Sequence, residues 1–127
     1  MRSSLEASKK TVQEFYDCLI NKKDFGSASK YIGDRYIQHN PLVADGPEGL
    51  KALIDLLKTN YPAARSEIKR IFADGDYVII HVHSVRVPKT RGRAIFDLFR
   101  LEKGKIVEHW DAIQEIPETS ANPNGMF

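Results

Sequence analysis

Cysteine is almost absent from this sequence, which has a single one, Cys18, among 127 residues. One cysteine cannot form an internal disulfide, and its position within an apolar helical pattern favours a buried, unreactive thiol. The chain also lacks any run of about 20 apolar residues that could span a membrane, and its first residues lack the apolar core of a signal peptide. We therefore expect a cytoplasmic protein that makes no membrane contact.

The sequence also lacks a large excess of charge of either sign. The 19 Lys and Arg residues are nearly balanced by 17 Asp and Glu residues, giving a formal net charge of +2. Only the segment 89–93 is densely basic, so we expect no nucleic-acid partner, although this loop could touch an anionic substrate. The stretch Gly46-Pro47-Glu48-Gly49 contains a proline and lacks the Lys-Ser/Thr ending of a phosphate-binding loop. ATP and dinucleotide chemistry are therefore disfavoured.

The residues that are present suffice for one domain. Apolar residues make up 42% of the chain, and a chain of this length buries roughly two-thirds of its unfolded surface. We expect a single domain over 1–127, in which 118–127 is a polar C-terminal tail. Met126 and Phe127 at its end suggest that the tail folds over a cavity or across a dimer.

Helical spacing of apolar residues dominates the first half of the sequence. It predicts helices over about 5–22 and 25–32, then an extended run over 36–40. A third helix is expected from Pro47 to about Asn60, because proline is favoured in the first turn.

From Arg65 onward the period changes to two, which is typical of strands. Strands are expected over 68–73, 77–87, 94–101 and 106–116, with the first turn at Asp74-Gly75. Helices followed by consecutive strands predict an α+β fold, with helices packed on one face of a curved, mainly antiparallel sheet.

The turn near Lys103 decides which side chains share a face of the last two strands, because a slip of one residue exchanges the faces. A two-residue turn at Lys103-Gly104 would place Leu101 opposite Ile106 and Asp97 on the face opposite to Asp111. A three-residue turn would instead place Asp97 opposite His109. We favour the three-residue turn, because it requires a positive φ only of the glycine.

The favoured register places two carboxylates and an imidazole among apolar side chains. This first face carries Ile95, Asp97, Phe99, Val107, His109, Asp111 and Ile113. An apolar surface with a few convergent polar groups is typical of a small-molecule pocket, and burial there would raise a carboxyl pKa. An alternative is that Asp97 and His109 only satisfy each other within the sheet.

The second face carries Phe96, Leu98, Arg100, Ile106, Glu108, Trp110 and Ala112, and we expect it to form a subunit interface.

Other side chains could reach the same pocket. Tyr16 and Tyr36 could each direct a hydroxyl into it, although aromatic residues at such positions are more often core. His39 and Asn40 end an extended run just before a loop, which suits a pocket mouth, or Asn40 caps its own turn. The pair His81 and His83 is a weak metal signal, and we expect no metal site.

One long stretch resembles a known family. Residues Phe96-Asp97-Leu98-Phe99-Arg100-Leu101-Glu102-Lys103-Gly104-Lys105-Ile106-Val107-Glu108-His109-Trp110-Asp111, with 36–41 and Asp45-Gly46-Pro47 upstream, resemble the SnoaL-like polyketide cyclase branch of the nuclear transport factor 2-like superfamily. The ending 113–124 is similar to a subgroup described as predicted aldol-condensation enzymes.

The resemblance implies a cone-shaped, cystatin-like α+β barrel that forms a homodimer through the open face of its sheet. It also implies an apolar cavity without a metal or organic cofactor. The cyclases have a general acid/base aspartate at the position of Asp111 and an asparagine near the pocket at that of Asn40. This chain differs in having Asp97, where some cyclases have histidine, and Ile95, where some have a polar residue.

Together, the residues and the resemblance predict a cofactor-independent acid/base enzyme acting on a small, largely apolar carbonyl compound. Aldol-type cyclisation, isomerisation and dehydration are all compatible with this chemistry. Asp111 would move the proton, helped by Asp97 and His109. The expected substrate-binding residues are Asn40, His39, Tyr16, Tyr36 and Phe99. The alternative is a non-catalytic small-ligand-binding or dimeric interaction domain of the same fold.

Overall fold

The computed structural model describes residues 2–127 and confirms the α+β class. These residues form three α-helices, two short helical turns and five strands of one sheet, and the first strand precedes the third α-helix. The helical elements are α1 (Arg2–Tyr16), the π-helical turn η1 (Asp17–Asn21), α2 (Phe25–Ala28), the 3-10 turn η2 (Ser29–Tyr31) and α3 (Gly46–Asn60). The strands are β1 (Ile32–Gln38), β2 (Arg65–Asp74), β3 (Tyr77–Val85), β4 (Arg93–Glu102) and β5 (Lys105–Glu115). No helix within 2–127 is long and apolar enough to cross a membrane.

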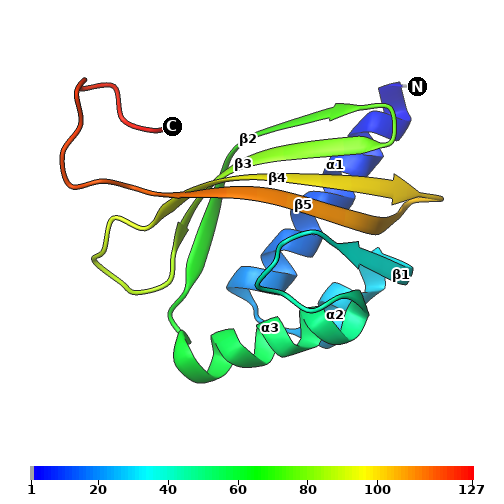
Figure 1. Ribbon diagram of the computed structural model, residues 1–127. Helices are drawn as coiled ribbons and strands as arrows, with labels where there is room; N and C mark the ends of the chain where they lie inside the picture. Colours follow the sequence, from blue (N-terminus) through cyan, green and yellow to red (C-terminus); the bar gives the residue numbers. More distant parts are fainter. Residues whose placement is uncertain (1) are drawn as a thin grey trace.

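The sheet has the strand order β1-β5-β4-β3-β2, with only the β1–β5 pair parallel. Helix α1 crosses behind the sheet and contacts β2 and β3, while α3 lies beside β1 (Figure 1). On β3, Val78, Ile80 and Val82 are fully buried against the helices, whereas Tyr77 and Ile79 remain exposed on the other face. We call these the inner and outer faces of the sheet.

The core lies between the inner face and the helices. Phe15 of α1 packs edge-to-face on Phe99 of β4, with ring centroids 6.0 Å apart, and both side chains are almost completely buried. Leu50 and Ile54 of α3 complete this core from below. Truncating a buried phenylalanine of this kind to alanine costs about 3–5 kcal/mol of stability.

The second helix is shorter than the sequence predicts. Helix α2 ends at Ala28 and a 3-10 turn ends at Tyr31, so the chain is already extended at Ile32. The expected extended run at 36–40 is the end of a longer strand that stops at Gln38. Pairing of Ile32 with Ile106 of β5, far away in the sequence, overrides the local helical spacing.

The first hairpin turn lies one residue later than predicted. Asp74 pairs with Tyr77, so the two turn residues are Gly75 and Asp76. Gly75 has φ of +56°, the conformation that a tight hairpin of this kind needs at its first central position.

The turn between β4 and β5 also differs from the prediction. Glu102 pairs with Lys105, so the turn has two residues, and Lys103 adopts a φ of +51° beside Gly104 at +78°. This turn type matches the natural twist of the strands, and Lys103 lies in solvent where the unusual conformation is tolerated. The preference for a three-residue turn was therefore wrong.

A β-bulge brings Asp97, His109 and Asp111 onto one face of the sheet, as predicted. Leu101 pairs with Ile106 but Arg100 pairs with Glu108, so Val107 is an extra residue on β5. The bulge shifts the register by one, which places Asp97 opposite Asp111 rather than opposite His109. Ile106, predicted on the outer face, is completely buried in the core instead.

The C-terminal tail loops away from the end of β5 (Figure 1), and its last residue returns to the outer face of the sheet. Residues 116–127 have no regular secondary structure, and Phe127 comes back to the sheet (Figure 1). Its ring lies 4.8 Å from that of His83 and 5.3 Å from that of His81. One of the two expectations was that the tail folds over the cavity. The tail does not cover the inner-face cavity described below, so that expectation was wrong.

Candidate active site

A small cavity lies between the inner face of the sheet and the helices. Apolar side chains of α3, among them Leu50, Leu53 and Leu57, form one wall, and inner-face residues of β4 and β5 form the other. The cavity volume, counted as the space open to the centre of a water molecule, is about 80 Å³. This corresponds to on the order of six waters, so the cavity fits a small organic molecule rather than a multi-ring compound.

Seven of the eight predicted site residues line this cavity. They come from α1, β1, the following loop, β4 and β5: Tyr16, Tyr36, Asn40, Asp97, Phe99, His109 and Asp111. The alternation of side chains along β4 and β5 brings the last four to one face, while the pairing of β1 with β5 adds Tyr36 and Asn40.

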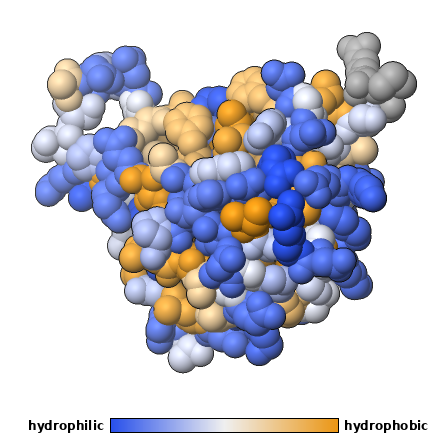
Figure 2. Space-filling model, turned by 45° about the vertical axis from the view of Figure 1, so that its right-hand side comes forward, coloured by the Kyte–Doolittle hydropathy of each residue, from blue (hydrophilic) through white to orange (hydrophobic). Residues whose placement is uncertain are grey.

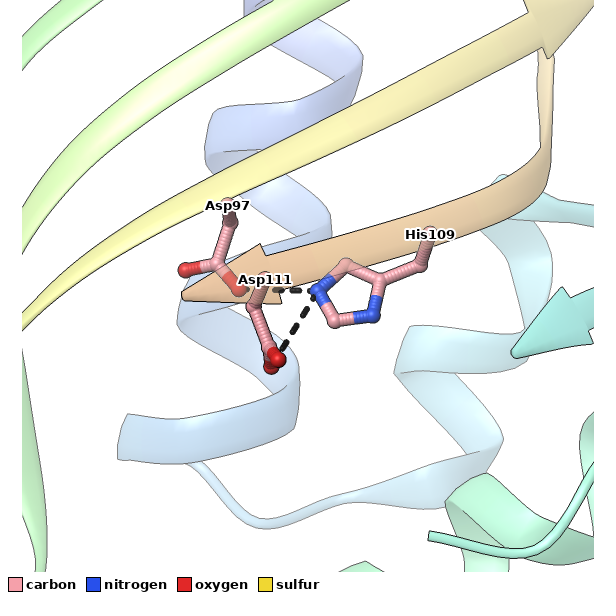
Figure 3. Close-up of side chains that lie close together, drawn as sticks. All are labelled: Asp97, His109 and Asp111. Carbon is pink, nitrogen blue, oxygen red and sulfur yellow. Dashed lines mark hydrogen bonds and ion pairs between the residues drawn. The ribbon is translucent and has the colours of Figure 1, made fainter. Parts of the chain in front are cut away.

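Asp97, His109 and Asp111 form a close cluster in the cavity (Figure 3). The Nε2 atom of His109 lies 2.8 Å from Oδ1 of Asp97 and 3.8 Å from Oδ2 of Asp111. Asp97 is 3% exposed and His109 is 7% exposed, so both are removed from bulk water. The cluster can therefore hold and transfer protons in an environment where charge is poorly screened.

Gln38 fixes the orientation of the imidazole. Its Oε1 atom accepts the backbone N–H of Asn40 at 3.0 Å and lies 2.7 Å from Nδ1 of His109. Because Oε1 is an acceptor, this network assigns a proton to Nδ1 of His109. Nε2 is therefore the nitrogen that exchanges a proton with the carboxylates.

The two aspartates have different environments. Burial raises the pKa of Asp97, although its hydrogen bond to His109 opposes the shift. Oδ2 of Asp97 is buried and has no hydrogen-bond partner within residues 2–127. Asp111 lies nearer to solvent, and its Oδ2 accepts a hydrogen bond of 2.9 Å from Nδ2 of Asn40. The cavity therefore contains one carboxyl that favours its protonated form and another that is held by a neutral donor.

Aromatic side chains surround the imidazole. The ring of Phe99 lies 4.9 Å from that of His109, and the ring of Tyr36 is stacked with it at 6.3 Å. Burial, followed by the charge of Asp97, raises the pKa of both Tyr16 and Tyr36 well above the ordinary value. Both hydroxyls therefore stay protonated and can act as hydrogen-bond donors.

Comparison with known families identifies the fold. The profile described as the SnoaL-like domain matches residues 12–109, which is most of the chain. The protein belongs to the SnoaL-like domain family. No curated protein matches the chain.

Solved structures with the same fold show what this SnoaL-like domain is similar to. A candidate polyketide cyclase from Bacillus cereus has a TM-score of 0.73 at 21% identity, covering 84% of this chain and 74% of the other. A candidate ketosteroid isomerase from Kribbella flavida has a TM-score of 0.72 at 15% identity, covering 95% and 85%. An NTF2-like protein of unknown function from Cytophaga hutchinsonii has a TM-score of 0.70 at 21% identity, covering 84% and 89%. At these identities the likeness establishes the NTF2-like fold alone.

His39 is the predicted site residue that this SnoaL-like domain places elsewhere. Its ring stacks on Trp110 with centroids 4.7 Å apart, and its Nε2 lies 2.7 Å from Oε2 of Glu108. Both partners belong to the outer face of β5. Side chains alternate along the extended chain, so Gln38 and Asn40 face the cavity and His39 faces away. The expectation that His39 lies at the pocket mouth was therefore wrong.

The pair His81 and His83 also lies on the outer face. His81 stacks on Phe96 with centroids 4.2 Å apart, and it contacts Arg70 through Nδ1. Burial, with the nearby charge of Arg70, lowers the pKa of His81.

The side-chain atoms whose spacing could hold a metal ion belong to Asp97, His109 and Asp111 rather than to His81 and His83. One atom each from Asp97, His109 and Asp111 lies within 4.8 Å of the others. The oxygens nearest Nε2 already take part in hydrogen bonds, with His109 and with Asn40, so the same spacing also suits proton transfer.

Sequence reasoning missed four polar residues of the cavity: Gln38, Ser84, Arg86 and Arg93. Gln38 could have been found from the alternation that links Tyr36 to Asn40. Arg86 and Arg93 flank the basic loop, and only the closure of the sheet shows that they reach the cavity.

Proposed function

We propose that this SnoaL-like domain is a cofactor-independent acid/base enzyme that moves a proton next to the carbonyl group of a small compound. The observation that carries the proposal is the arrangement of Asp111 beside the His109–Asp97 pair in a largely apolar cavity. Asp111 Oδ1 makes no hydrogen bond within residues 2–127, so this atom can accept a proton from a ligand.

One distribution of protons is consistent with the contacts of the cluster. Asp97 is neutral with its proton on Oδ2, His109 carries protons on both nitrogens, and Asp111 is ionised. His109 then donates to Gln38 and to Asp97 Oδ1, and its positive charge is balanced by Asp111 at 3.8 Å. The cluster is neutral overall, which suits its low exposure to water.

This distribution gives each group a part in enolate formation. Asp111 Oδ1 takes a proton from the carbon next to the carbonyl, and the electron pair of the broken C–H bond moves to the carbonyl oxygen. The Oδ2–H group of Asp97 and the Tyr16 hydroxyl donate hydrogen bonds to that oxygen as it becomes negative. The enolate then attacks a second carbonyl, as in an aldol closure, or takes a proton at another carbon, as in an isomerisation.

The unpaired atoms of the cluster favour this function over a purely structural role. A structural hydrogen-bond cluster would have every polar atom paired with another side chain or with the backbone. Here Oδ2 of Asp97 is buried without a partner in the described chain, which is costly unless a ligand or a proton uses it. This atom therefore supports a cavity that binds a polar group.

We also propose that the protein is a homodimer formed through the outer face. Phe96 is 54% exposed and Phe72 is 61% exposed there, and Ile79, Leu98 and Trp110 line an apolar hollow between the strands. Figure 2 shows apolar side chains reaching the surface among hydrophilic ones. A second copy would remove this apolar surface from water.

Proton exchange tests the catalytic proposal without knowledge of the natural substrate. Wild-type protein in heavy water should speed the exchange of the hydrogens next to the carbonyl of small cyclic and linear ketones, followed by NMR. Asp111→Asn should lower the exchange rate by about 100-fold or more, in line with general acid–base contributions. Asp55→Asn, at an exposed site on α3, is the matched control and should exchange at the wild-type rate.

Exchange should also persist in the presence of a chelator, because the proposal uses no metal ion. Wild-type exchange in Asp111→Asn, or complete loss of exchange with the chelator, contradicts the proposed chemistry.

A further inference from the structure

The cavity has a second polar end that the proton chemistry does not use. Arg86 and Arg93 line the same cavity as Asp97 and Asp111. The two arginines, with Ser84, also line a wider hollow at the surface, beside the loop that joins β3 to β4. The arginine end is therefore where the cavity meets solvent.

The strand register fixes the distance between the two ends. Arg93 and Asp97 lie on the inner face of β4, four residues apart, which corresponds to about 13 Å along the strand. The side chain of arginine is long, so its guanidinium group can extend back toward the aspartates. Tyr16 lines the same cavity, and its hydroxyl is affected by the charges of both Asp97 and Arg93.

Neither arginine has an acidic partner. Within residues 2–127, no Asp or Glu forms an ion pair with Arg86 or Arg93, and Glu115 makes none although it lies opposite Arg93 on β5. Arg86 lies over the ring of Tyr61 at 5.2 Å, and burial, with the positive charge of Arg93, lowers the pKa of Arg86. Two half-buried cations thus lie close together without neutralisation.

Arg100 on the outer face provides the contrast within the same chain. It is also half-buried, yet Glu102 accepts from it at 2.7 Å and Glu108 at 2.8 Å. A partly buried arginine with a structural role is neutralised there by two carboxylates. Arg86 and Arg93 lack such partners at a cavity mouth, so their positive charge is available to a ligand.

We propose that the cavity binds an oxo-acid, a small carbonyl compound whose carboxylate is held by Arg86 and Arg93 while its carbonyl lies between Asp97 and Asp111. The planar guanidinium group matches a carboxylate with two parallel hydrogen bonds, and two such groups neutralise the anion. The carbonyl half of this inference rests on the proposed function, whereas the acid half rests on the arginines alone. The substrate is therefore apolar in its middle and anionic at its outer end.

Binding of a defined probe series tests the acid half. Levulinate, longer linear oxo-carboxylates and their methyl esters are titrated into wild-type protein by calorimetry, with inorganic phosphate as a competing anion. The acids should bind at least tenfold more tightly than their esters, with an optimum chain length and weakening at high salt. Phosphate should bind no more tightly than the esters.

Matched arginine variants identify the cationic site. The double variant Arg86→Gln with Arg93→Gln should weaken binding of the best acid by about 100-fold, because each charge-assisted contact is worth roughly a factor of ten or more. Lys89→Gln removes one positive charge from the loop between β3 and β4, but Lys89 is exposed and lines neither the inner cavity nor the wider hollow, so binding should be unchanged. Thermal unfolding of each variant shows that the fold is retained.

The two proposals fail in different ways. Equal binding of acids and esters, an equal effect of Lys89→Gln, or tighter binding of phosphate overturns the oxo-acid inference, even if ketone exchange depends on Asp111. Conversely, acid binding that depends on both arginines, without any exchange catalysed by Asp111, supports the anion site and overturns the enzymatic proposal. Asp111→Asn should still bind the acid.

Discussion

Asp97 and Asp111 lie directly opposite each other on β4 and β5, with their side chains on the inner face of the sheet. Two carboxylates so close cannot both ionise at low cost in a buried cavity, so one of them favours the protonated state. His109, two residues before Asp111 on β5, lies within reach of both. The cluster therefore combines a retained proton with an available base.

The raised pKa of Asp97 predicts an unusual pH dependence of stability. Because the folded state binds this proton more tightly than the unfolded state, the favourable contribution is fully present below the ordinary aspartate pKa of about 3.9 and is lost as the pH rises through the raised folded value. Asp97→Asn is neutral at every pH and lacks this loss.

Urea unfolding of both proteins between pH 3 and pH 8, a range chosen around that ordinary pKa, measures the effect. The free energy of unfolding of Asp97→Asn, relative to wild type, should increase with pH by at most about 1.4 kcal/mol per pH unit. His109, Asp111 and Tyr16 face the same carboxyl, so their signals should be followed by NMR in the same titration. If the difference in free energy of unfolding between Asp97→Asn and wild type is constant or decreases with pH, the carboxyl of Asp97 does not have a raised pKa in the folded protein.

Gln38 should act as a positioning residue. Gln38→Leu removes the acceptor that holds Nδ1–H of His109, so the ring loses its fixed orientation, and ketone exchange should fall by roughly ten- to a hundredfold. Gln38→Glu keeps an acceptor and should retain most of the activity. Nitrogen NMR of His109 provides the readout that a structural role alone would not change, because Gln38→Leu removes the hydrogen bond of Nδ1–H and should shift the Nδ1 resonance. An unchanged Nδ1 resonance together with unchanged exchange would argue against this role.

The proposed dimer predicts the effect of a charge on the outer face. Wild-type protein should sediment as a particle of twice the 14.4 kDa chain mass. Phe96→Asp should give monomers, because it places a carboxylate in the centre of the apolar hollow. Leu42→Asp is the control, since Leu42 is 92% exposed in a loop away from the sheet. A wild-type monomer, or loss of the dimer in the Leu42 variant as well, would rule out this interface.

The sequence by itself determined the fold class and seven of the residues that line the cavity. Helical spacing before residue 61 and alternation after residue 65 indicate helices packed on a sheet, and alternation within 105–115 places His109 and Asp111 on one face. Both patterns are local, since side-chain direction follows from the conformation of the chain itself. These patterns, together with the resemblance to the SnoaL-like cyclases, selected Asp97, His109, Asp111, Tyr16, Tyr36, Asn40 and Phe99 before the structure was known.

The tertiary structure decided the register and the remaining walls of the cavity. Burial of Leu101 opposite Ile106 and the positive φ of Lys103 together require the bulge at Val107, a balance that no local pattern reveals. The parallel pairing of β1 with β5 turned Gln38 inward and His39 outward. Arg86 and Arg93 reached the cavity only when the sheet closed over α3, because contacts between residues distant in the sequence depend on how whole elements pack.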